Sequence, residues 1–270
     1  MPSAFLGDRG LVRVTGTDAC AFLQGLFTCN VAKVAPGHPA FGALLTPQGK
    51  ITADFIVGEG EGAHFLDCPL ALAADLAKRL RFYKLRANVE IADLSATHGV
   101  AACWGDNAAG EPDPRDARLG GRIAGERAAL EAAHGRDDAG YEALRVSLGT
   151  PKGGVDFPWG ETFPHDANMD LLGGVDFKKG CYVGQEVVSR VEHRGAARKR
   201  VVRLRYEGPP PAPGTPVLAG DIEAGVTGSL AGDLGLAMLR LDRVAEARAR
   251  GAALTAGAAR VVEVVEPAGR

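Results

Sequence analysis

The sequence lacks several features that would assign it at once to a class of protein. No window reaches the ~18 uncharged apolar residues that a membrane span needs. The first residues, MPSAFLGDRGLVRV, carry Asp8 and Arg9 too early for the uninterrupted apolar core of a signal peptide. The formal net charge of −2 gives no general reason to bind a polyanion. We therefore expect a cytoplasmic protein with no membrane partner.

Closely spaced cysteine pairs are also missing. No two of the five cysteines stand at the C-x₂₋₄-C spacing of a zinc or iron–sulfur site. Cys68 and Cys103 lie beside apolar residues, which favours small buried hydrophobic side chains. The glycine-rich GEGEG at 58–62 lacks the G-x-G-x-x-G spacing of a dinucleotide-binding loop. The sequence predicts no permanently bound metal.

Local patterns predict a mixture of strands and helices. A hairpin is expected over AFGALLTPQGKITADFIVGEGEG, because apolar runs flank the turn residues 46–49. Pro69 begins a predicted helix whose leucines recur at every fourth residue. Other helices are expected over 138–149, near Pro164 and over GQEVVSRVEH. Because the order shows no regular βαβα rhythm, we expect an α+β fold, and the glycine-broken β-rich runs after about residue 199 predict a small barrel or sandwich.

One stretch, KKGCYVGQEVVSR at 178–190, places a lone cysteine in an unusual setting. Cys181 follows Lys178 and Lys179 and precedes a predicted helix, and both cations and helix N-termini lower the pKa of a thiol. Gly180 and Gly184 allow a tight turn and the close approach of a ligand. The alternative interpretation is a buried loop cysteine whose glycines serve only the bend. The residue types alone leave both interpretations open.

Several strings occur together in one order: LVRVTGTDACAFLQGLFTCNV, LLTPQGKITADF, YKLRANVEI, EALRVSLGTP and GVDFKKGCYVGQEVVSRVEHRGAARKR. Over residues 5–205 they resemble the YgfZ-type folate-binding proteins, relatives of the glycine cleavage T-protein. The resemblance implies a T-protein-like ring of three subdomains around a central channel for tetrahydrofolate. It implies a folate-binding body at 1–197, made of two interleaved subdomains, and a C-terminal β-barrel domain at 198–270.

The resemblance also implies a function. Family members help to make or maintain iron–sulfur proteins, including radical enzymes that modify tRNA, so iron–sulfur client or assembly proteins are the expected partners. The cysteine of the K-G-C-Y-x-G-Q-E string is the residue tied to that function, and here it is Cys181. Tetrahydrofolate, or a one-carbon derivative of it, is the expected cofactor.

Two positions of the T-protein decide whether its enzymatic activity can be expected of this sequence. Asp54 matches the aspartate beside the folate nitrogen, although Ala53 replaces a second acid. The alternative is an exposed carboxylate at a strand edge. Ser147 stands where the T-protein holds the pterin with a glutamate, and a hydroxyl lacks the charge-assisted bonding of a carboxylate. Arg145 in the same segment is a candidate folate ligand, and the alternative is a surface residue of the helix. Asp166 is a candidate substitute carboxylate. The replacement of the T-protein glutamate by Ser147 weighs against aminomethyl transfer.

Further residues are expected to line the channel. They are polar side chains of the N-terminal segment and of HDANMDLL, namely Gln24, Thr28, Asn30 and Asn168. For each, the alternative is a turn residue that bonds local backbone. Lys179 is expected to lower the thiol pKa and to pair with the glutamate tail of folate.

Three functional hypotheses follow. The first is a folate-binding accessory factor for iron–sulfur proteins that uses Cys181, and the second is an aminomethyltransferase that uses Asp54. The third is a module that binds RNA or a protein partner through the basic stretch at 190–205, where seven Lys or Arg face only one acid, Glu192. Direct RNA binding is the least favoured, because interleaved aromatic residues are missing apart from Tyr206.

Overall fold

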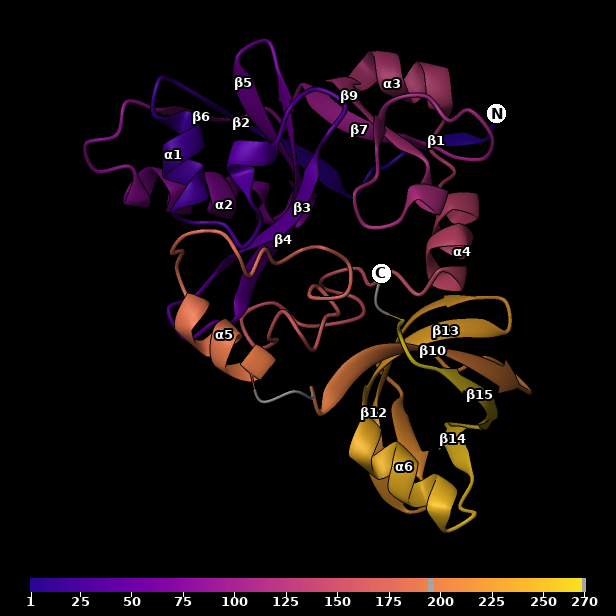
Figure 1. Cartoon of the computed structure of the whole chain (residues 1–270). Helices are drawn as coiled ribbons and strands as arrows, with labels where there is room; N and C mark the ends of the chain where they lie inside the picture. The colour runs from indigo at the N-terminus through magenta and orange to yellow at the C-terminus, as the bar shows by residue number, and fades with distance from the viewer. Residues whose placement is uncertain (194–196, 269–270) are drawn as a thin grey trace. The chain divides into compact units, whose positions relative to one another are not determined.

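The computed structural model describes residues 1–193 and 197–268, which group into two compact units (Figure 1). The first unit comprises Met1–Tyr141 and Leu172–Gln185, and the second comprises Glu142–Leu171 and Glu186–Arg270. The chain therefore enters the second unit, returns to the first and crosses once more. Arg194 of the predicted basic stretch and the last two residues of the predicted barrel domain lie outside the described residues. The predicted boundary at 197/198 stays a prediction.

The first unit begins with a five-stranded antiparallel sheet. Its strands are β2 (Arg9–Thr15), β3 (Ala40–Leu45), β4 (Ile51–Gly60), β5 (Ala63–Pro69) and β6 (Glu90–Asp93), and their order in the sheet is β3-β4-β5-β2-β6. The hairpin predicted around 46–49 is confirmed, because β3 and β4 pair directly across that turn.

Three helical segments accompany this sheet: α1 (Ala19–Gln24), the 3₁₀ turn η1 (Val31–Lys33) and α2 (Leu70–Tyr83). Pro69 is the N-cap of α2, as its position in the sequence predicts. Leu76 and Leu80 of α2 enter one core with Leu23 of α1 and Phe55 of β4, so both helices bury their apolar faces against the same side of the sheet.

A smaller four-stranded sheet completes the first unit. Its strands are β1 (Ser3–Phe5), β7 (His98–Cys103), β8 (Glu111–Pro112) and β9 (Gly121–Glu126), in the order β1-β7-β9-β8, with the 3₁₀ turn η2 (Ala117–Leu119) before β9. Helix α3 (Arg127–His134), which the sequence patterns above do not predict, packs Leu130 against Phe5 and Ala101.

Buried charges join the two sheets of the first unit. Asp67 of β5 accepts hydrogen bonds from Arg9 at 2.6 Å and from Arg122 of β9 at 2.5 Å. Arg122 and Arg115 also reach Asp113, and all four of the charged side chains Asp67, Asp113, Arg115 and Arg122 are buried. Since each charge has an opposite partner, the cluster fixes how β5 and β9 pack.

The second unit begins inside α4 (Ala139–Ser147), at Glu142. The first three residues of this helix belong to the first unit. A run of turns occupies 152–171, and the helix predicted near Pro164 is wrong. The reason is local: Asn168 adopts φ 61°, a left-handed conformation that cannot continue a right-handed helix. Helix α5 (Gln185–His193), which begins at the end of the first unit, confirms the helix predicted over GQEVVSRVEH.

A closed barrel forms the rest of the second unit. Its strands are β10 (Lys199–Glu207), β11 (Pro216–Ala219), β12 (Ile222–Ala231), β13 (Leu234–Arg240), β14 (Leu254–Ala256) and β15 (Ala259–Val265), and α6 (Leu241–Ala249) connects β13 to β14. The order β10-β13-β12-β11-β14-β15 closes on itself, which leaves no open sheet edge. The predicted fold class, an α+β body with a C-terminal β-barrel, is confirmed.

The helices of residues 1–193 and 197–268 all fall short of the length and apolar character that crossing a membrane requires.

Candidate functional site

The segment 172–184 carries the cysteine motif and belongs to the first unit. Lys179 fastens it to the rest of that unit. The Lys179 ammonium donates to the backbone carbonyls of Gln24, Phe27 and Cys29 at 2.7, 2.6 and 2.8 Å. These three bonds use all three N–H donors of the ammonium. Lys179 is buried, and burial lowers its pKa, although Asp176 acts in the opposite direction.

Polar side chains from the N-terminal segment complete this attachment. Thr28 Oγ1 donates to the carbonyl of Gly174 at 2.6 Å, and Asn30 Nδ2 donates to Asp176 at 3.1 Å. Gln24 Oε1 accepts the backbone N–H of Val31 at 2.7 Å. The structure thus brings Gln24, Thr28 and Asn30 together with the loop, where they bond protein groups.

Asp176 acts as a second anchor of the same loop. Its Oδ1 accepts the backbone N–H groups of Lys178 at 2.8 Å and Lys179 at 3.0 Å. Burial acts to raise the pKa of Asp176, but these bonds, the Asn30 amide and nearby Lys33 outweigh burial and hold that pKa below its usual value. The carboxylate therefore stays ionised and keeps the turn before Cys181 closed.

Cys181 itself is exposed, while Tyr182 beside it is buried. The buried Tyr182 ring lies 5.2 Å from the Lys179 ammonium, and burial raises its pKa to about 12. Gly184 has φ 82°, and a Cβ there would lie 2.6 Å from the carbonyl oxygen of Thr46. Gly184 is thus required for the close approach of the loop to the β3–β4 turn, whereas a Cβ at Gly180 would meet open space.

The remaining cysteines are less accessible. Cys29, Cys68 and Cys103 are buried, as the sequence predicts for the last two, and Cys20 is half-buried. Burial raises the pKa of both Cys29 and Cys68 to about 12, so these thiols stay protonated at neutral pH. All five cysteines lie in the described part of the chain, and Cys181 is the only one of them that is exposed. The buried-loop interpretation of Cys181 is therefore wrong.

The predicted site residues are divided between the units. Asp54 lies buried in β4 of the first unit, opposite Ala43, so the alternative of an exposed carboxylate at a strand edge is wrong. Arg145, Ser147 and Asn168 belong to the second unit. Ser147 Oγ donates to the carbonyl of Leu144 at 2.7 Å, which is a bond within its own helix.

Arg145 is fully buried rather than a surface residue. Its guanidinium binds Glu142 through Nε and Nη2, Ser229 through Nη2, and Asp156 and the Thr150 carbonyl through Nη1. These five bonds account for every N–H that an arginine carries. The expected contact of Arg145 with a folate does not fit this arrangement, and neither does that of Lys179, because neither cation keeps a free donor.

Among the predicted ligands of the second unit, Asn168 differs from Arg145 because it keeps a polar atom that bonds no protein group. Its Nδ2 donates to the carbonyl of Val201 at 2.7 Å, while its buried Oδ1 has no hydrogen-bond partner. A buried acceptor without a donor is costly, so a ligand N–H would satisfy it.

The basic stretch at 190–205 is partly neutralised within the second unit. Arg200 binds both oxygens of Asp170, Arg203 binds the carbonyl of Ser147, and Arg205 binds Asp233 and Glu263. Asp170 also lies in a group with His165 and Glu192 whose ligand atoms fall within 4.8 Å of one another. Because Arg200 already binds both Asp170 oxygens, this group is an ion-pair cluster that is poorly suited to bind a metal ion.

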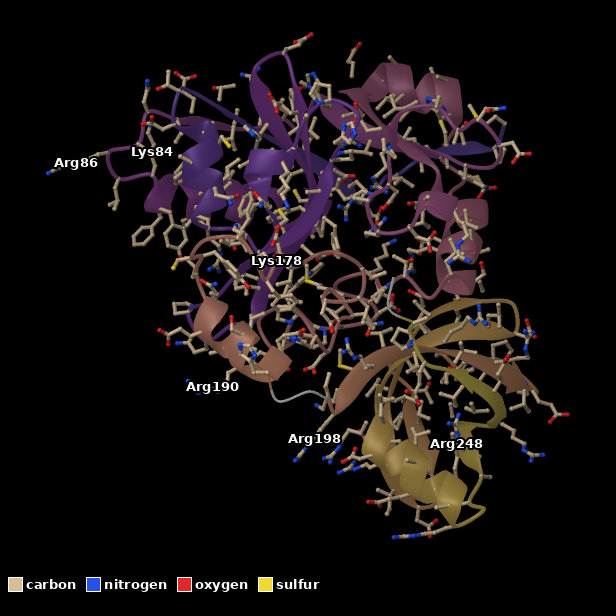
Figure 2. All side chains as sticks on the ribbon, viewed as in Figure 1. Lys84, Arg86, Lys178, Arg190, Arg198 and Arg248 are labelled. Atoms are coloured by element: carbon tan, nitrogen blue, oxygen red, sulfur yellow. The ribbon has the colours of Figure 1, made fainter. Side chains whose placement is uncertain are left out.

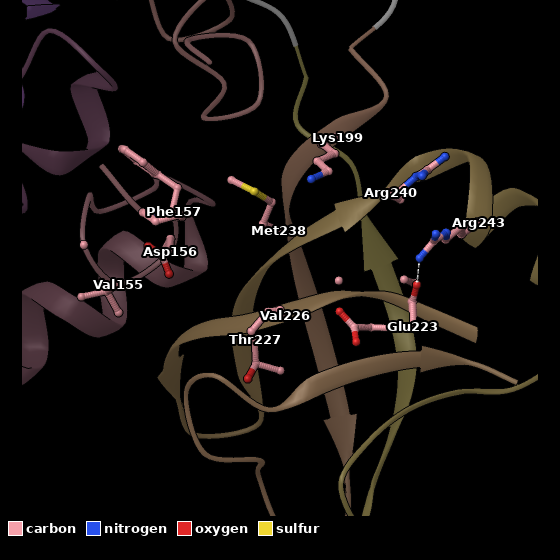
Figure 3. Close-up of a pocket in the computed structure, with 14 residues that line it drawn as sticks. Val155, Asp156, Phe157, Lys199, Glu223, Val226, Thr227, Met238, Arg240 and Arg243 are labelled. Carbon is pink, nitrogen blue, oxygen red and sulfur yellow. Dashed lines mark hydrogen bonds between the residues drawn. The ribbon is translucent and has the colours of Figure 1, made fainter. Parts of the chain in front are cut away.

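A pocket of about 560 Å³ lies in the second unit, and none of the predicted site residues lines it (Figure 3). It is bounded by residues 154–158 and by strands β10, β12 and β13. Lys199, Arg240 and Arg243 contribute cations to its wall, and Arg243 donates to the Glu223 carbonyl. No local sequence pattern predicts this pocket, because its lining comes from short segments that are far apart in the chain.

Two protein families match parts of this chain. Residues 8–110 match the GCVT N-terminal domain, and residues 198–268 match the C-terminal beta-barrel domain of CAF17. The mouse protein named "Iron-sulfur cluster assembly factor IBA57, mitochondrial" is 31% identical over 277 residues, which cover 88% of this chain and 77% of the mouse protein. The chain belongs to the IBA57 family.

Other IBA57 proteins show the same relationship. The human one is 31% identical over 88% of this chain and 77% of its own length. The homologue from Mycosarcoma maydis is 33% identical over 76% of this chain, which spans only 58% of that longer protein. Among solved structures, the aminomethyltransferase T of the Bartonella henselae glycine cleavage system matches 99% of this chain and 85% of its own, with TM-score 0.70 and 15% identity. At that identity the match shows the fold alone, which is the T-protein fold expected from the sequence.

The IBA57 comparison corrects one prediction. The relatives are named as mitochondrial proteins, so the prediction of a cytoplasmic location is wrong. That prediction rested on the lack of a signal-peptide core and of a membrane span, and neither feature distinguishes the two compartments.

Proposed function

We propose that this protein is an iron–sulfur cluster assembly factor that uses Cys181 as its functional thiol. The observation that carries the proposal is the family relationship, because relatives at 31% identity over 77% of their length are named for that role. The exposed Cys181 on a loop fastened through Lys179 supports it. We include radical tRNA-modifying enzymes among the proposed clients.

The chemistry of one exposed cysteine limits how it takes part. A thiolate is a soft ligand that suits iron–sulfur clusters, but a cluster requires about four such ligands. Cys181 is the only exposed cysteine of this chain, so we propose that a partner protein supplies the others. The cluster is then cargo shared at Cys181, and iron–sulfur client or assembly proteins are the partners.

The test is complementation. A strain that lacks its own copy is supplied with this chain, and the activity of an iron–sulfur enzyme is measured beside that of an enzyme without a cluster. We expect the first activity to return and the second to stay constant. If the iron–sulfur enzyme stays inactive although this chain is present in folded form, the proposal is wrong.

We propose tetrahydrofolate as a second ligand on one specific observation, the unpartnered Oδ1 of Asn168. The amino group of a pterin is an N–H donor that would satisfy it. Titration with tetrahydrofolate, followed through the fluorescence of Trp104 and Trp159 and through the melting temperature, tests the idea. We expect quenching and a higher melting temperature, both weakened in Asn168→Leu; no change in the unsubstituted protein would overturn this part alone.

A further inference from the structure

Two apolar side chains project from the end of α2. Phe82 is 81% exposed and Leu85 is 90% exposed, the highest values for large apolar residues in the part of the chain that the structure describes. Leu76 and Leu80 of the same helix are buried, so the helix already places its apolar face in the core. Phe82 and Leu85 are therefore not needed for the core, and their exposure is unfavourable in water.

The backbone holds Leu85 outward. Its φ of 43° lies in the left-handed region, which a bulky side chain seldom adopts. Lys84, just before it, is the C-cap of α2 with ordinary helical geometry. Strain of this kind is found at binding and switching sites more often than elsewhere.

Cationic residues flank Phe82 and Leu85 in the sequence. Residues 78–86, KRLRFYKLR, which we call the α2 tip, contain five Lys or Arg and no acid. Arg79 is neutralised by Asp75 at 2.6 Å, while Arg81 donates to the Ile91 carbonyl and so keeps its charge. Arg86 points away from the chain in Figure 2, and Lys84 lines the adjacent hollow. The tip therefore presents Phe82 and Leu85 on a segment that is otherwise cationic.

A hollow of about 470 Å³ lies next to the tip. Arg13, Arg81 and Lys84 line it with Glu90 and Thr15, so three cations face one acid. Arginine and lysine in such a group bind phosphate oxygens through charge-assisted hydrogen bonds. The hollow can thus bind a phosphate group beside the exposed side chains of Phe82 and Leu85.

We propose that the α2 tip and this hollow make a reversible contact with an anionic lipid surface. Phe82 and Leu85 would enter the acyl boundary, while Lys78, Lys84 and Arg86 meet the headgroups. We commit to a lipid rather than a protein partner because the tip carries five Lys or Arg and no acid, which matches a surface of uniform negative charge. The contact is independent of the iron–sulfur proposal and revises the expectation that the protein has no membrane partner.

The test uses flotation with phosphatidylcholine vesicles that contain about one third phosphatidylglycerol, compared with vesicles of phosphatidylcholine alone. We expect the full chain to float only with the anionic vesicles. Phe82→Ser/Leu85→Ser should lower the partition coefficient at least about tenfold, since the burial of two large apolar side chains is lost. Lys84→Glu/Arg86→Glu should lower it by a similar factor and remove most of its salt dependence.

Matched controls keep the outcome specific. Ile222→Ser/Val262→Ser removes two apolar side chains of the barrel that are 47% and 49% exposed, and it should leave flotation unchanged. Inorganic phosphate at matched ionic strength should not release the protein; release would assign the hollow to free phosphate and overturn the proposal. Equal flotation of the unsubstituted chain and Phe82→Ser/Leu85→Ser, or no flotation of either, would also overturn it.

Discussion

Lys179 donates a 2.6 Å hydrogen bond to the backbone carbonyl of Phe27, across 152 residues of sequence. Phe27 is fully buried, and its ring centroid lies 4.4 Å from that of Phe55 of β4, so the loop is attached to the hydrophobic core of the first unit. Cys181, only two residues further on, is exposed. The lysine before the cysteine thus fixes where the thiol is presented.

Replacing Lys179 should loosen the motif. Lys179→Met removes the donor of three backbone carbonyl groups, two of them in buried hydrogen bonds, and we expect it to lower the free energy of unfolding by about 2–5 kcal/mol. Urea denaturation measures this value. Lys178→Met is the matched control at the neighbouring exposed residue, and it should change stability by less than about 0.5 kcal/mol. Equal effects of both changes would contradict the assigned role of Lys179.

The two glycines that flank Cys181 should respond differently. Gly184→Ala forces a Cβ to within 2.6 Å of the Thr46 oxygen at φ 82°, and we expect a loss of about 1–3 kcal/mol. Gly180→Ala meets open space and should be tolerated. Thermal unfolding of the two variants checks the difference. A destabilised Gly180→Ala beside an unaffected Gly184→Ala would refute this description of the loop.

Acid should weaken the charge cluster between the sheets of the first unit. Burial acts to raise the pKa of Asp113, but Arg115 and Arg122 outweigh burial and hold that pKa well below its usual value. Because the folded-state pKa is lower than the unfolded one, this stability is complete above the unfolded value of about 3.9 and is lost as pH falls through the folded value. The pKa of Asp67 is also lowered, because Arg122 and Arg9 outweigh the effect of burial, which acts to raise it.

The measurement is the free energy of unfolding from about pH 6 down to about pH 1.5, which covers the loss below the unfolded pKa. Asp113→Asn should lose about 3–5 kcal/mol near neutral pH, because Arg115 keeps a buried charge without its main partner. The same variant should lose less on acidification than the unsubstituted protein. Parallel pH profiles for the two proteins would show that Asp113 does not contribute as described.

Native alkylation should single out Cys181. Iodoacetamide is expected to modify Cys181 first, and to leave Cys29 and Cys68 unmodified until the chain is unfolded, because these two are buried and protonated. Peptide mass spectrometry at increasing reaction times gives the order. Early modification of Cys29 would mean that the loop held by Lys179 opens in solution.

The sequence predicted the main elements of the fold well. The β3–β4 hairpin, α2 after Pro69 and α5 all follow from local patterns of turn residues and apolar spacing. The helix expected near Pro164 fails, since Asn168 takes a left-handed conformation that its neighbours in sequence do not reveal.

The site was less predictable for a physical reason. Lys179 and Arg145 look from the sequence like free cations, yet both are buried and fully hydrogen-bonded to groups distant in the chain or in the turns. The exposure of Phe82 was likewise invisible, because an aromatic residue at the end of an amphipathic helix is ordinarily assigned to the core. Long-range contacts decide these roles, and no local pattern encodes them.

The most direct test of the central claim is complementation of a strain lacking its own copy by Cys181→Ser, read out as the activity of an iron–sulfur enzyme. Cys20→Ser, at a half-buried cysteine, is the matched control. We predict that Cys20→Ser restores the activity and that Cys181→Ser does not, although both proteins accumulate in folded form. Full restoration by Cys181→Ser would contradict the claim that this thiol carries the function.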